Sequence, residues 1–461
     1  MSQSLIVSIS GLRGIVGEAL TPAVAAEYGA VFGTFLRDQA CAEHGRPVVC
    51  MGRDSRPSGL MVQSAVCAGL CSVGVDVIDL GIVTTPSVGI MVRHLGCSGG
   101  VVITASHNPL PYNGIKLLNA QGMAPPAAMA GRIRQAFLDK AIRYVPSPEC
   151  GRVTSNSHSD EVHVGKVLGV VDPAAIGARG FEVVLDSVNG AGARPGKRLL
   201  AALGCKVKAI NARPTGLFAH EPEPTEKNLQ GLCRVVRKAQ ADIGFAQDPD
   251  ADRLAIVDGQ GTYLGEEYTL ALAARHVLGK TPGVTAANLS TSRMIDDVAA
   301  LTGSRVVRTP VGEANVASAM IEHGCVIGGE GNGGVIDLRI GPVRDSLVAM
   351  AMVLQQMAET GQTVRQLADQ IGHYVMHKDK FTASPDQAAR ILDLARQRFS
   401  QAKADTRDGY RFDFVDGWLH LRTSNTEPIM RVIVETRDEA TARRYLDQVE
   451  QIRNQAILSS D

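Results

Sequence analysis

The sequence lacks an excess of charge of either sign, long apolar runs and aromatic side chains. Its 47 Lys and Arg residues balance 47 Asp and Glu residues over 461 positions, and no basic block stands out. Aromatic residues make up 4%, with Trp418 as the single tryptophan, so no surface for single-stranded nucleic acid is expected. No run of 18 apolar residues is present, so no membrane span is expected. The composition therefore predicts no nucleic-acid or membrane partner, and any positive charge that binds an anionic substrate must be local.

Signs of disulfides and of export are also missing. The nine cysteines, an odd number, include no C-x-x-C pair. The first residues show no basic segment followed by a long apolar one, so no signal peptide is expected. Reduced thiols in a cytoplasmic protein are the simplest interpretation. A chain of this length is expected to form two to four domains.

One pattern of strand, polar loop, helix, glycine and strand occurs three times. The copies cover residues 48–78, 181–210 and 287–307. Each predicts a βαβ unit, which usually has parallel strands, so we expect three similar α/β domains in tandem.

The C-terminal part of the chain follows another pattern. Two helical stretches, 387–401 and from about Glu439, alternate with strands near 418–421 and 430–434, which predicts a smaller α+β domain. The predicted fold is thus α/β with mixed sheets in three domains, plus this fourth domain. We place the four domains at residues 1–155, 156–257, 258–372 and 373–461.

A serine loop follows the apolar run 101–103, with the sequence Thr104–Pro109. The pattern predicts a buried strand that opens into a tight loop, with Ser106 at its tip and His107 beside it. Open α/β folds do their chemistry at this edge of a sheet. Taken alone, the pair could suggest acyl transfer. We favour a structural role for His107, ordering the loop, over an acid/base role.

Three aspartates, Asp248, Asp250 and Asp252, have the spacing of a metal site. Side chains at i, i+2 and i+4 at a strand end can converge on one point. Clustered carboxylates repel one another unless a cation lies among them, and oxygen ligands favour Mg²⁺. An EF-hand is excluded, because Arg253 stands where glycine is required and Gly259 where glutamate is required. A solvated acidic turn is the remaining alternative.

Two further loops are rich in groups that bind sugars or phosphates. Residues 329–334 match G-x-G-x-x-G, but a strand-like segment follows, so we interpret them as a turn presenting Glu330 and Asn332 to hydroxyls. Residues 422–428 have the composition of a phosphate cradle between two strands. A plain turn is the alternative for each loop.

Two individual basic residues also lie near these motifs. Arg13 lies between glycines that allow a tight backbone turn, and Lys116 follows the Asn113-Gly114 turn. A lysine held near other cations can lose its proton and act as a base. Each residue could equally be an ordinary surface residue.

These loops, in this order, resemble the α-D-phosphohexomutase superfamily of phosphoglucomutases, phosphomannomutases and phosphoglucosamine mutases. The resemblance covers the whole chain and rests on residues 10–14, 52–56, 104–109, 248–253, 329–334 and 422–428. It implies four domains around a central cleft and an intramolecular phosphotransferase. The implied reaction passes through a hexose 1,6-bisphosphate intermediate in a monomer or homodimer.

The resemblance also implies a role for each motif. Ser106 would be a phosphoserine whose phosphoryl oxygen completes a Mg²⁺ site with the three aspartates. Lys116 would be the general base, with His107 nearby and Arg13 and Arg253 on the phosphoryl group. The sugar and its distal phosphate would bind residues in three loops and one following strand: Gly312, Glu313, Glu330, Asn332, Arg422, Ser424, Asn425, Thr426 and Arg431.

Some positions depart from the pattern of many bacterial members. Asn332 and Gly334 stand where those members carry serine and histidine, and Pro249 replaces a frequent glycine. The glycine-rich loop resembles that of the archaeal-type phosphoglucosamine mutase group, which implies glucosamine phosphate as substrate. Mannose or glucose phosphates are the near alternative. A phosphatase and a non-catalytic family member are more distant ones.

Overall fold

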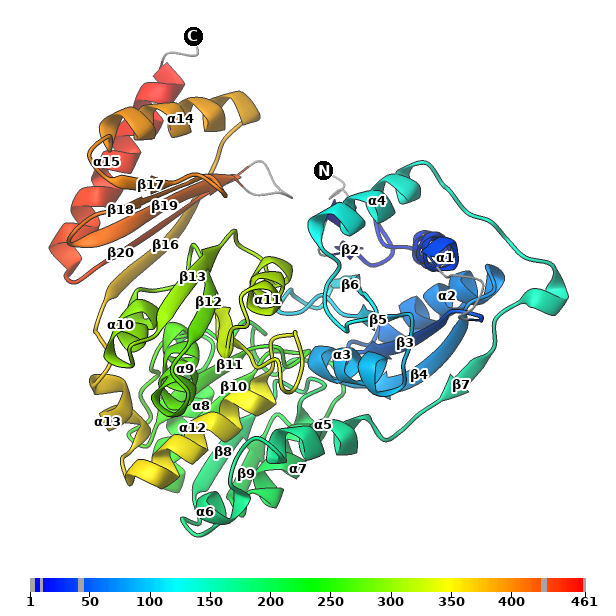
Figure 1. The fold of residues 1–461 in the computed structure, drawn as a ribbon, viewed down its shortest axis with the longest axis horizontal. Helices are drawn as coiled ribbons and strands as arrows, with labels where there is room; N and C mark the ends of the chain where they lie inside the picture. The colour runs from blue at the N-terminus through cyan, green and yellow to red at the C-terminus, as the bar shows by residue number, and fades with distance from the viewer. Residues whose placement is uncertain (1–4, 9–10, 40–44, 424–428, 459–461) are drawn as a thin grey trace.

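Four β-sheets, each packed against helices, make up the computed structural model (Figure 1), which describes residues 5–8, 11–39, 45–423 and 429–458. The sheets follow one another along the chain and contain seven, four, four and five strands. The first three are mixed, and the fourth is antiparallel. The predicted fold class is therefore confirmed.

The first sheet carries the serine loop between two of its central strands. Its strand order is β1-β2-β6-β5-β3-β4-β7, and the loop connects β5 to its antiparallel neighbour β6. The strands are β1 (Ile6–Ser8), β2 (Gly11–Ile15), β3 (Val48–Arg53), β4 (Asp76–Ile82), β5 (Gly99–Ile103), β6 (Tyr112–Leu118) and β7 (Val153–Ser155). The helices are α1 (Pro22–Gln39), α2 (Gly59–Ser72), α3 (Thr85–His94), α4 (Ala127–Leu138) and the 3₁₀ turn η2 (Ser147–Glu149).

The second and third sheets repeat this arrangement on a smaller scale. Their strand orders are β11-β10-β8-β9 and β13-β12-β14-β15. The strands are β8 (Glu182–Asp186), β9 (Lys206–Ile210), β10 (Ile243–Gln247), β11 (Leu254–Asp258), β12 (Val284–Asn288), β13 (Arg305–Thr309), β14 (Ile327–Glu330) and β15 (Gly334–Ile336). The helices are α5 (Ser159–Leu168), α6 (Pro173–Gly177), α7 (Ala193–Ala202), α8 (Gln230–Ala239), α9 (Glu267–Lys280), α10 (Met294–Leu301), α11 (Glu313–Glu322), α12 (Ser346–Thr360) and α13 (Val364–Asp369).

The three predicted βαβ units are confirmed as parallel pairs, β3–β4, β8–β9 and β12–β13. The helix of each unit is followed by a glycine in the left-handed region, with φ of 80°, 73° and 66° at Gly74, Gly204 and Gly303. A side chain is disfavoured in that conformation, which explains the glycine in each copy. The serine, aspartate and sugar loops also occupy one shared position, each joining a central strand to its antiparallel neighbour.

One hydrophobic core is continuous between the second and third sheets. Helix α12, buried along most of its length, packs against α9 of the third sheet and against α5, α6 and α7 of the second. The first and fourth sheets are built mainly on separate cores. The aspartate loop and the sugar loop are therefore carried by one packed unit, which fixes their relative position.

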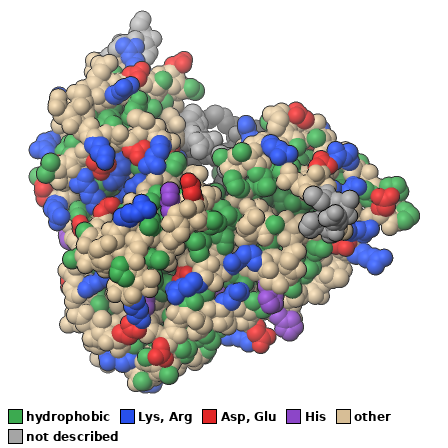
Figure 2. Space-filling view, viewed as in Figure 1, with side chains coloured by type: hydrophobic (Ala, Val, Ile, Leu, Met, Phe, Trp, Pro, Cys, Tyr) green, Lys and Arg blue, Asp and Glu red, His purple; other side chains and the backbone are tan. Residues whose placement is uncertain are grey.

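The fourth sheet lies at the upper left of Figure 1, and α14 and α15 cover one of its faces. Its order is β16-β20-β19-β18-β17. The elements are β16 (Val375–Thr382), α14 (Pro385–Arg398), β17 (Lys403–Asp405), β18 (Tyr410–Asp413), β19 (Gly417–Thr423), β20 (Ile429–Thr436) and α15 (Glu439–Leu458). In Figure 2 the molecular surface is notched between this part and the first sheet. Among the described residues, no helix is long and apolar enough to cross a membrane.

Candidate active site

Ser106 lies in the loop after β5, and its hydroxyl points at the aspartate loop. Its Oγ donates to Asp248 Oδ2 at 3.0 Å and lies 3.4 Å from His107 Nδ1. The residue is 3% exposed, and its φ of 50° is uncommon for a residue with a side chain. A hydrogen bond from Ser106 N to Thr104 Oγ1, 2.9 Å long, helps to hold this conformation. The metal loop, rather than the histidine, is thus the main partner of the hydroxyl.

The three predicted aspartates converge between β10 and β11. One oxygen from each lies within 4.8 Å of the other two, and all three residues are fully buried. Burial and the neighbouring carboxylates of Asp252 and Asp250 hold the pKa of Asp248 well above its ordinary value. Within the described part of the chain, Asp250 Oδ1 and Asp252 Oδ1 are buried without a hydrogen-bond partner. Unpaired oxygens in an all-oxygen cluster fit a hard dication such as Mg²⁺.

Lys116 lies on β6 with carboxylates around it. Its Nζ is 2.7 Å from Asp250 Oδ2 and 3.4 Å from Asp252 Oδ2. Burial lowers the pKa of Lys116, but the attraction of Asp250, Asp252 and Glu313 outweighs burial and raises it above the ordinary value. Other cations were expected around Lys116, but carboxylates surround it. The register between β5 and β6 places its side chain at the aspartate loop.

His107 lies in the serine loop, and the predicted phosphoryl-binding arginines border this loop. The pKa of His107 lies well below its ordinary value, because the cation of Arg253, burial and the cation of Arg13 disfavour its charged form. The imidazole is thus neutral at pH 7. Arg13 Nη1 donates to Asn108 Oδ1 at 2.5 Å. Glu223 Oε1 lies 3.9 Å from His107 Nε2 and 4.0 Å from Arg253 Nη1.

Arg56 holds the backbone of the serine loop in place. Its guanidinium is buried, pairs with Asp54 Oδ2 at 3.1 Å and donates to four backbone carbonyls. Those carbonyls belong to Ser106, Asn108, Pro109 and Tyr112, at 2.7, 2.6, 2.9 and 3.0 Å. The motif 52–56 carried the family resemblance, but nothing in its sequence indicated which backbone groups the arginine would bind.

The predicted sugar-binding residues gather at the third sheet. Glu330 Oε1 accepts from Asn288 Nδ2 at 2.7 Å and from Gly312 N at 3.1 Å. Glu313 Oε1 accepts from a backbone N–H in the loop before α12, and burial raises the pKa of its carboxyl. Among the described residues, Asn332 Oδ1 is buried without a partner. The third sheet therefore carries one polar group next to the aspartate loop, made up of Gly312, Glu313, Glu330 and Asn332.

Arg344 links that group to the aspartate loop and was missed by sequence analysis. Its Nη1 donates to Glu330 Oε2 and its Nη2 to Asp252 Oδ2, both at 2.6 Å. The next residue, Asp345, caps α12 by accepting from Leu347 N. An aspartate before an apolar run is a recognisable helix-start signal, whereas the target of the preceding arginine is set by tertiary structure.

The fourth sheet contributes Arg422 and Arg431, which face each other on β19 and β20. Arg422 Nε pairs with Asp408 at 3.1 Å, and Asp408 Oδ2 accepts from Val311 N at 2.9 Å. The loop before Glu313 is thereby tied to Arg422. Ser424, Asn425 and Thr426, predicted to bind phosphate, lie outside the described residues.

Comparison with known proteins matches the four successive parts of the chain to four family domains. Residues 5–142, 161–261 and 266–374 match the α/β/α domains I, II and III of phosphoglucomutase/phosphomannomutase, and residues 376–452 match its C-terminal domain. The chain belongs to the phosphoglucomutase/phosphomannomutase family. It is thus a phosphohexomutase, as the resemblance implied. We refer to its parts as domains I to IV; our own boundaries remain a prediction.

Relatives of this phosphohexomutase carry two kinds of name. A phosphoglucomutase/phosphomannomutase of Thermococcus kodakarensis is 39% identical, over 95% of this chain and 96% of the relative. A probable phosphoglucosamine mutase of Methanopyrus kandleri is 37% identical, over 95% of each chain. A family protein of Burkholderia thailandensis has a similar structure, with a TM-score of 0.86, 26% identity and coverage of 98% and 97%. The names agree on the family and differ on the sugar.

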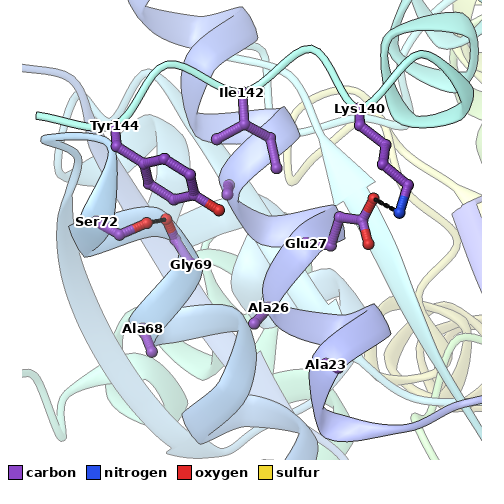
Figure 3. Close-up of a pocket in the computed structure, with 10 residues that line it drawn as sticks. Ala23, Ala26, Glu27, Ala68, Gly69, Ser72, Lys140, Ile142 and Tyr144 are labelled. Atoms are coloured by element: carbon purple, nitrogen blue, oxygen red, sulfur yellow. Dashed lines mark hydrogen bonds and ion pairs between the residues drawn. The ribbon is translucent and has the colours of Figure 1, made fainter.

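A groove of about 590 Å³ in domain I lies apart from these residues. It runs between α1, α2 and the segment 140–144, and alanines make up much of its lining (Figure 3). Lys140 and Glu27 form an ion pair at one end, and Tyr144 lies at the other. None of the predicted site residues lines it, so the phosphohexomutase site is assigned by its side chains and not by this cavity.

Proposed function

We propose that this phosphohexomutase interconverts glucosamine 6-phosphate and glucosamine 1-phosphate through a phosphoserine at Ser106. The observation that carries the proposal is the hydrogen bond from Ser106 Oγ to Asp248, beside one oxygen each of Asp250 and Asp252 that, among the described residues, has no hydrogen-bond partner. A hydroxyl in that place suits a phosphoryl carrier, because phosphoryl transfer depends on charge neutralisation and positioning.

The proposed reaction conserves the phosphoryl groups through two transfers. In the first, the bond between phosphorus and Ser106 Oγ breaks, and a bond forms to the free hydroxyl at C1 or C6. The proton of that hydroxyl ends on Ser106 Oγ. The hexose 1,6-bisphosphate then turns over within the site, and its other phosphoryl group returns to Ser106 by the reverse exchange.

The aspartates would hold Mg²⁺, which neutralises charge on the transferring group when bound. Arg13 and Arg253 would hold the equatorial oxygens of that group, as their place beside the serine loop allows. Lys116, held as an ammonium by Asp250 and Asp252, would relay the proton by giving one to Ser106 Oγ and taking one from the sugar hydroxyl. Neutral His107 would support the loop without adding charge to it.

The sugar would bind residues of domain III, with Gly312, Glu313, Glu330 and Asn332 facing its hydroxyls. The carboxylates of Glu313 and Glu330 favour glucosamine in particular, since its protonated 2-amino group is a cation. Several archaeal relatives named probable phosphoglucosamine mutase support the same choice. The distal phosphate would bind residues of domain IV, namely Arg422, Ser424, Asn425, Thr426 and Arg431.

A second candidate acts on mannose or glucose phosphates by the same chemistry. The relative at 39% identity, named phosphoglucomutase/phosphomannomutase, favours it. Either candidate is proposed to work in the cytoplasm as a monomer or homodimer.

The two candidates are separated by kcat/KM on the 6-phosphates of glucosamine, mannose and glucose. We expect glucosamine 6-phosphate to lead by at least about tenfold, equal to about 1.4 kcal/mol of discrimination. A tenfold lead for a neutral hexose phosphate would contradict the glucosamine assignment. Release of inorganic phosphate at the turnover rate would instead identify a phosphatase.

A further inference from the structure

The guanidinium of Arg344 occupies the space between two carboxylates with different tasks. Asp252 belongs to the predicted metal site in domain II, and Glu330 to the predicted sugar site in domain III. Each accepts one hydrogen bond from Arg344, both 2.6 Å long, and the arginine is 7% exposed. The two donors, Nη1 and Nη2, belong to one rigid plane, so the bonds together fix the two carboxylates relative to each other.

The contacts of Arg344 leave an acceptor position on each of the two carboxylates, Asp252 and Glu330. Asp252 Oδ2 is taken by the arginine, while Asp252 Oδ1 is buried and, among the described residues, has no hydrogen-bond partner; Arg253 Nε lies 3.9 Å from it. Glu330 accepts three hydrogen bonds, whereas a carboxylate can accept about four. One acceptor position therefore remains for a ligand hydroxyl.

Gly334 provides the room that the side chain of Arg344 requires. A Cβ at Gly334 would lie 2.2 Å from Arg344 Cδ and 2.9 Å from its Cγ. Those carbons lie in the middle of a side chain held at its far end by two hydrogen bonds, so they cannot move aside freely. The glycine at this place in the sugar loop and the arginine after β15 are thus sterically linked.

The backbone around Arg344 is held by Glu313, at the start of α11, and by the aspartate loop. Its N–H donates to Glu313 Oε1 at 2.7 Å, and the N–H of Ser346 donates to Ala251 O, in the aspartate loop, at 3.2 Å. Asp345 Oδ2 lies 2.7 Å from His163 Nε2 of domain II. Side chain and backbone therefore join domain II to domain III at one point.

We propose that Arg344 is a positioning residue that sets the sugar-binding carboxylate Glu330 in register with the metal-binding carboxylate Asp252, with Gly334 as its required neighbour. The inference rests on the proposed roles of Asp252 and Glu330 in the mutase reaction. Register matters because the reacting hydroxyl must meet the phosphoryl group in line, and a misplacement of about 1 Å can cost about 100-fold in rate.

The test compares Arg344→Met, Arg344→Lys and Gly334→Ala with a matched control, Arg365→Met. Arg365 pairs with Asp258 at 2.8 Å, also between domains II and III, but touches none of the site residues. We expect kcat to fall about 100-fold in Arg344→Met and less in Arg344→Lys, since lysine is a point charge that reaches one carboxylate at a time. The control should keep its kcat within threefold.

Gly334→Ala tests the steric link without altering the arginine. It should lower kcat by at least tenfold. The double variant Arg344→Met/Gly334→Ala should be no worse than Arg344→Met alone, because the methionine is not held at its far end and can move away from the alanine. Additive losses in the double variant would contradict the link. Values of kcat within threefold of wild type in Arg344→Met would contradict the positioning role itself.

Two measurements separate positioning from other causes. Titration of Mn²⁺ into the full-length protein should give a Kd in Arg344→Met no more than threefold weaker than in wild type; loss of binding would mean that Arg344 builds the metal site instead. Melting curves should show each variant folded at the assay temperature; if Arg344→Met unfolds there, Arg344→Lys decides, and an unchanged kcat in it would overturn the proposal. All rate ratios are read on the sugar phosphate that wild type prefers, so an error in the glucosamine assignment changes the sugar but not the ratio.

Discussion

Ser106 Oγ donates to Asp248 Oδ2 at 3.0 Å, although 142 positions separate the two residues in the chain. The bond joins the serine loop of domain I to the aspartate loop of domain II. The local sequence suggests a serine–histidine pair instead. His107 Nδ1 lies farther from Ser106 Oγ, at 3.4 Å, and the lowered pKa of His107 keeps its ring neutral. This position beside the three aspartates supports the proposed role of Ser106 as phosphoryl carrier.

Replacing the serine should stop the reaction without harming the fold. In Ser106→Ala, turnover of every hexose phosphate should fall below detection, because no other described hydroxyl takes its place at Asp248. The melting temperature should stay close to that of wild type. Ser64→Ala, which removes an exposed hydroxyl on α2, serves as the control and should remain fully active.

Removing one metal-loop carboxylate should weaken dication binding. Groups that merely orient metal ligands are worth about 10- to 100-fold in affinity, so Asp250→Asn should weaken Mn²⁺ binding by about 100-fold or more. Isothermal titration of the full-length protein measures this. Asp258→Asn, in the next strand but outside the cluster, should bind Mn²⁺ as wild type does. Equal affinity in the two variants would argue against a metal site at the three aspartates.

The buried pair of Arg56 and Asp54 should matter for stability. Arg56→Met takes the charge partner from the buried carboxylate of Asp54 and one donor from each of four carbonyls, which should lower the free energy of unfolding of domain I by about 3 kcal/mol or more. The matched change Arg46→Met breaks a half-exposed pair with Asp76 and should cost less than about 1 kcal/mol. Urea denaturation of both variants provides the comparison, and equal losses would refute the role given to Arg56.

His420 should make the contact between domains III and IV sensitive to acid. Burial lowers the pKa of His420 to about 4, while its ring bonds Ser290 Oγ and Asp408 O. Because an unfolded histidine titrates near 6.5, the stabilising contribution is complete above about pH 6.5 and is lost as the pH falls through about 4.

The loss should be on the order of 3 kcal/mol, taken from a shift of about two and a half pKa units. Melting curves between pH 7 and pH 4 should fall more steeply for wild type than for His420→Gln, whereas the exposed control His323→Gln should follow wild type. Parallel curves for wild type and His420→Gln would contradict this prediction.

Glu313 should contribute to the choice of sugar. Its carboxylate lies beside Glu330 in the proposed sugar site, and Glu313→Gln removes the charge while keeping an acceptor for Arg344 N. The ratio of kcat/KM for glucosamine 6-phosphate over glucose 6-phosphate should fall about tenfold, or about 1.4 kcal/mol. An unchanged ratio would remove Glu313 from the proposed recognition of the amino group.

Much of this arrangement could be predicted because it depends on local sequence. The strands before the serine and aspartate loops are apolar runs, and Gly74, Gly204 and Gly303 mark the helix ends by their backbone conformation. The serine, aspartate and sugar loops each join a central strand to its antiparallel neighbour, so predicting the strands also placed the residues in these loops.

Other features depend on contacts that no local pattern encodes. The environment of Lys116 follows from strand register between β5 and β6, and the targets of Arg344 follow from the core shared by domains II and III. A sequence shows that an arginine precedes α12, but not that its guanidinium meets carboxylates 14 and 92 positions away. The relevance of Gly334 likewise became visible only with Arg344 beside it.

The central claim is that Ser106 carries the phosphoryl group, and peptide mass spectrometry tests it most directly. The purified protein is incubated with a hexose 1,6-bisphosphate, digested and examined before and after a chase with excess hexose monophosphate. We expect one phosphoryl group on the peptide that contains Ser106, and its loss to the sugar during the chase. A phosphoryl group on another residue, or turnover with Ser106 never phosphorylated, would contradict it.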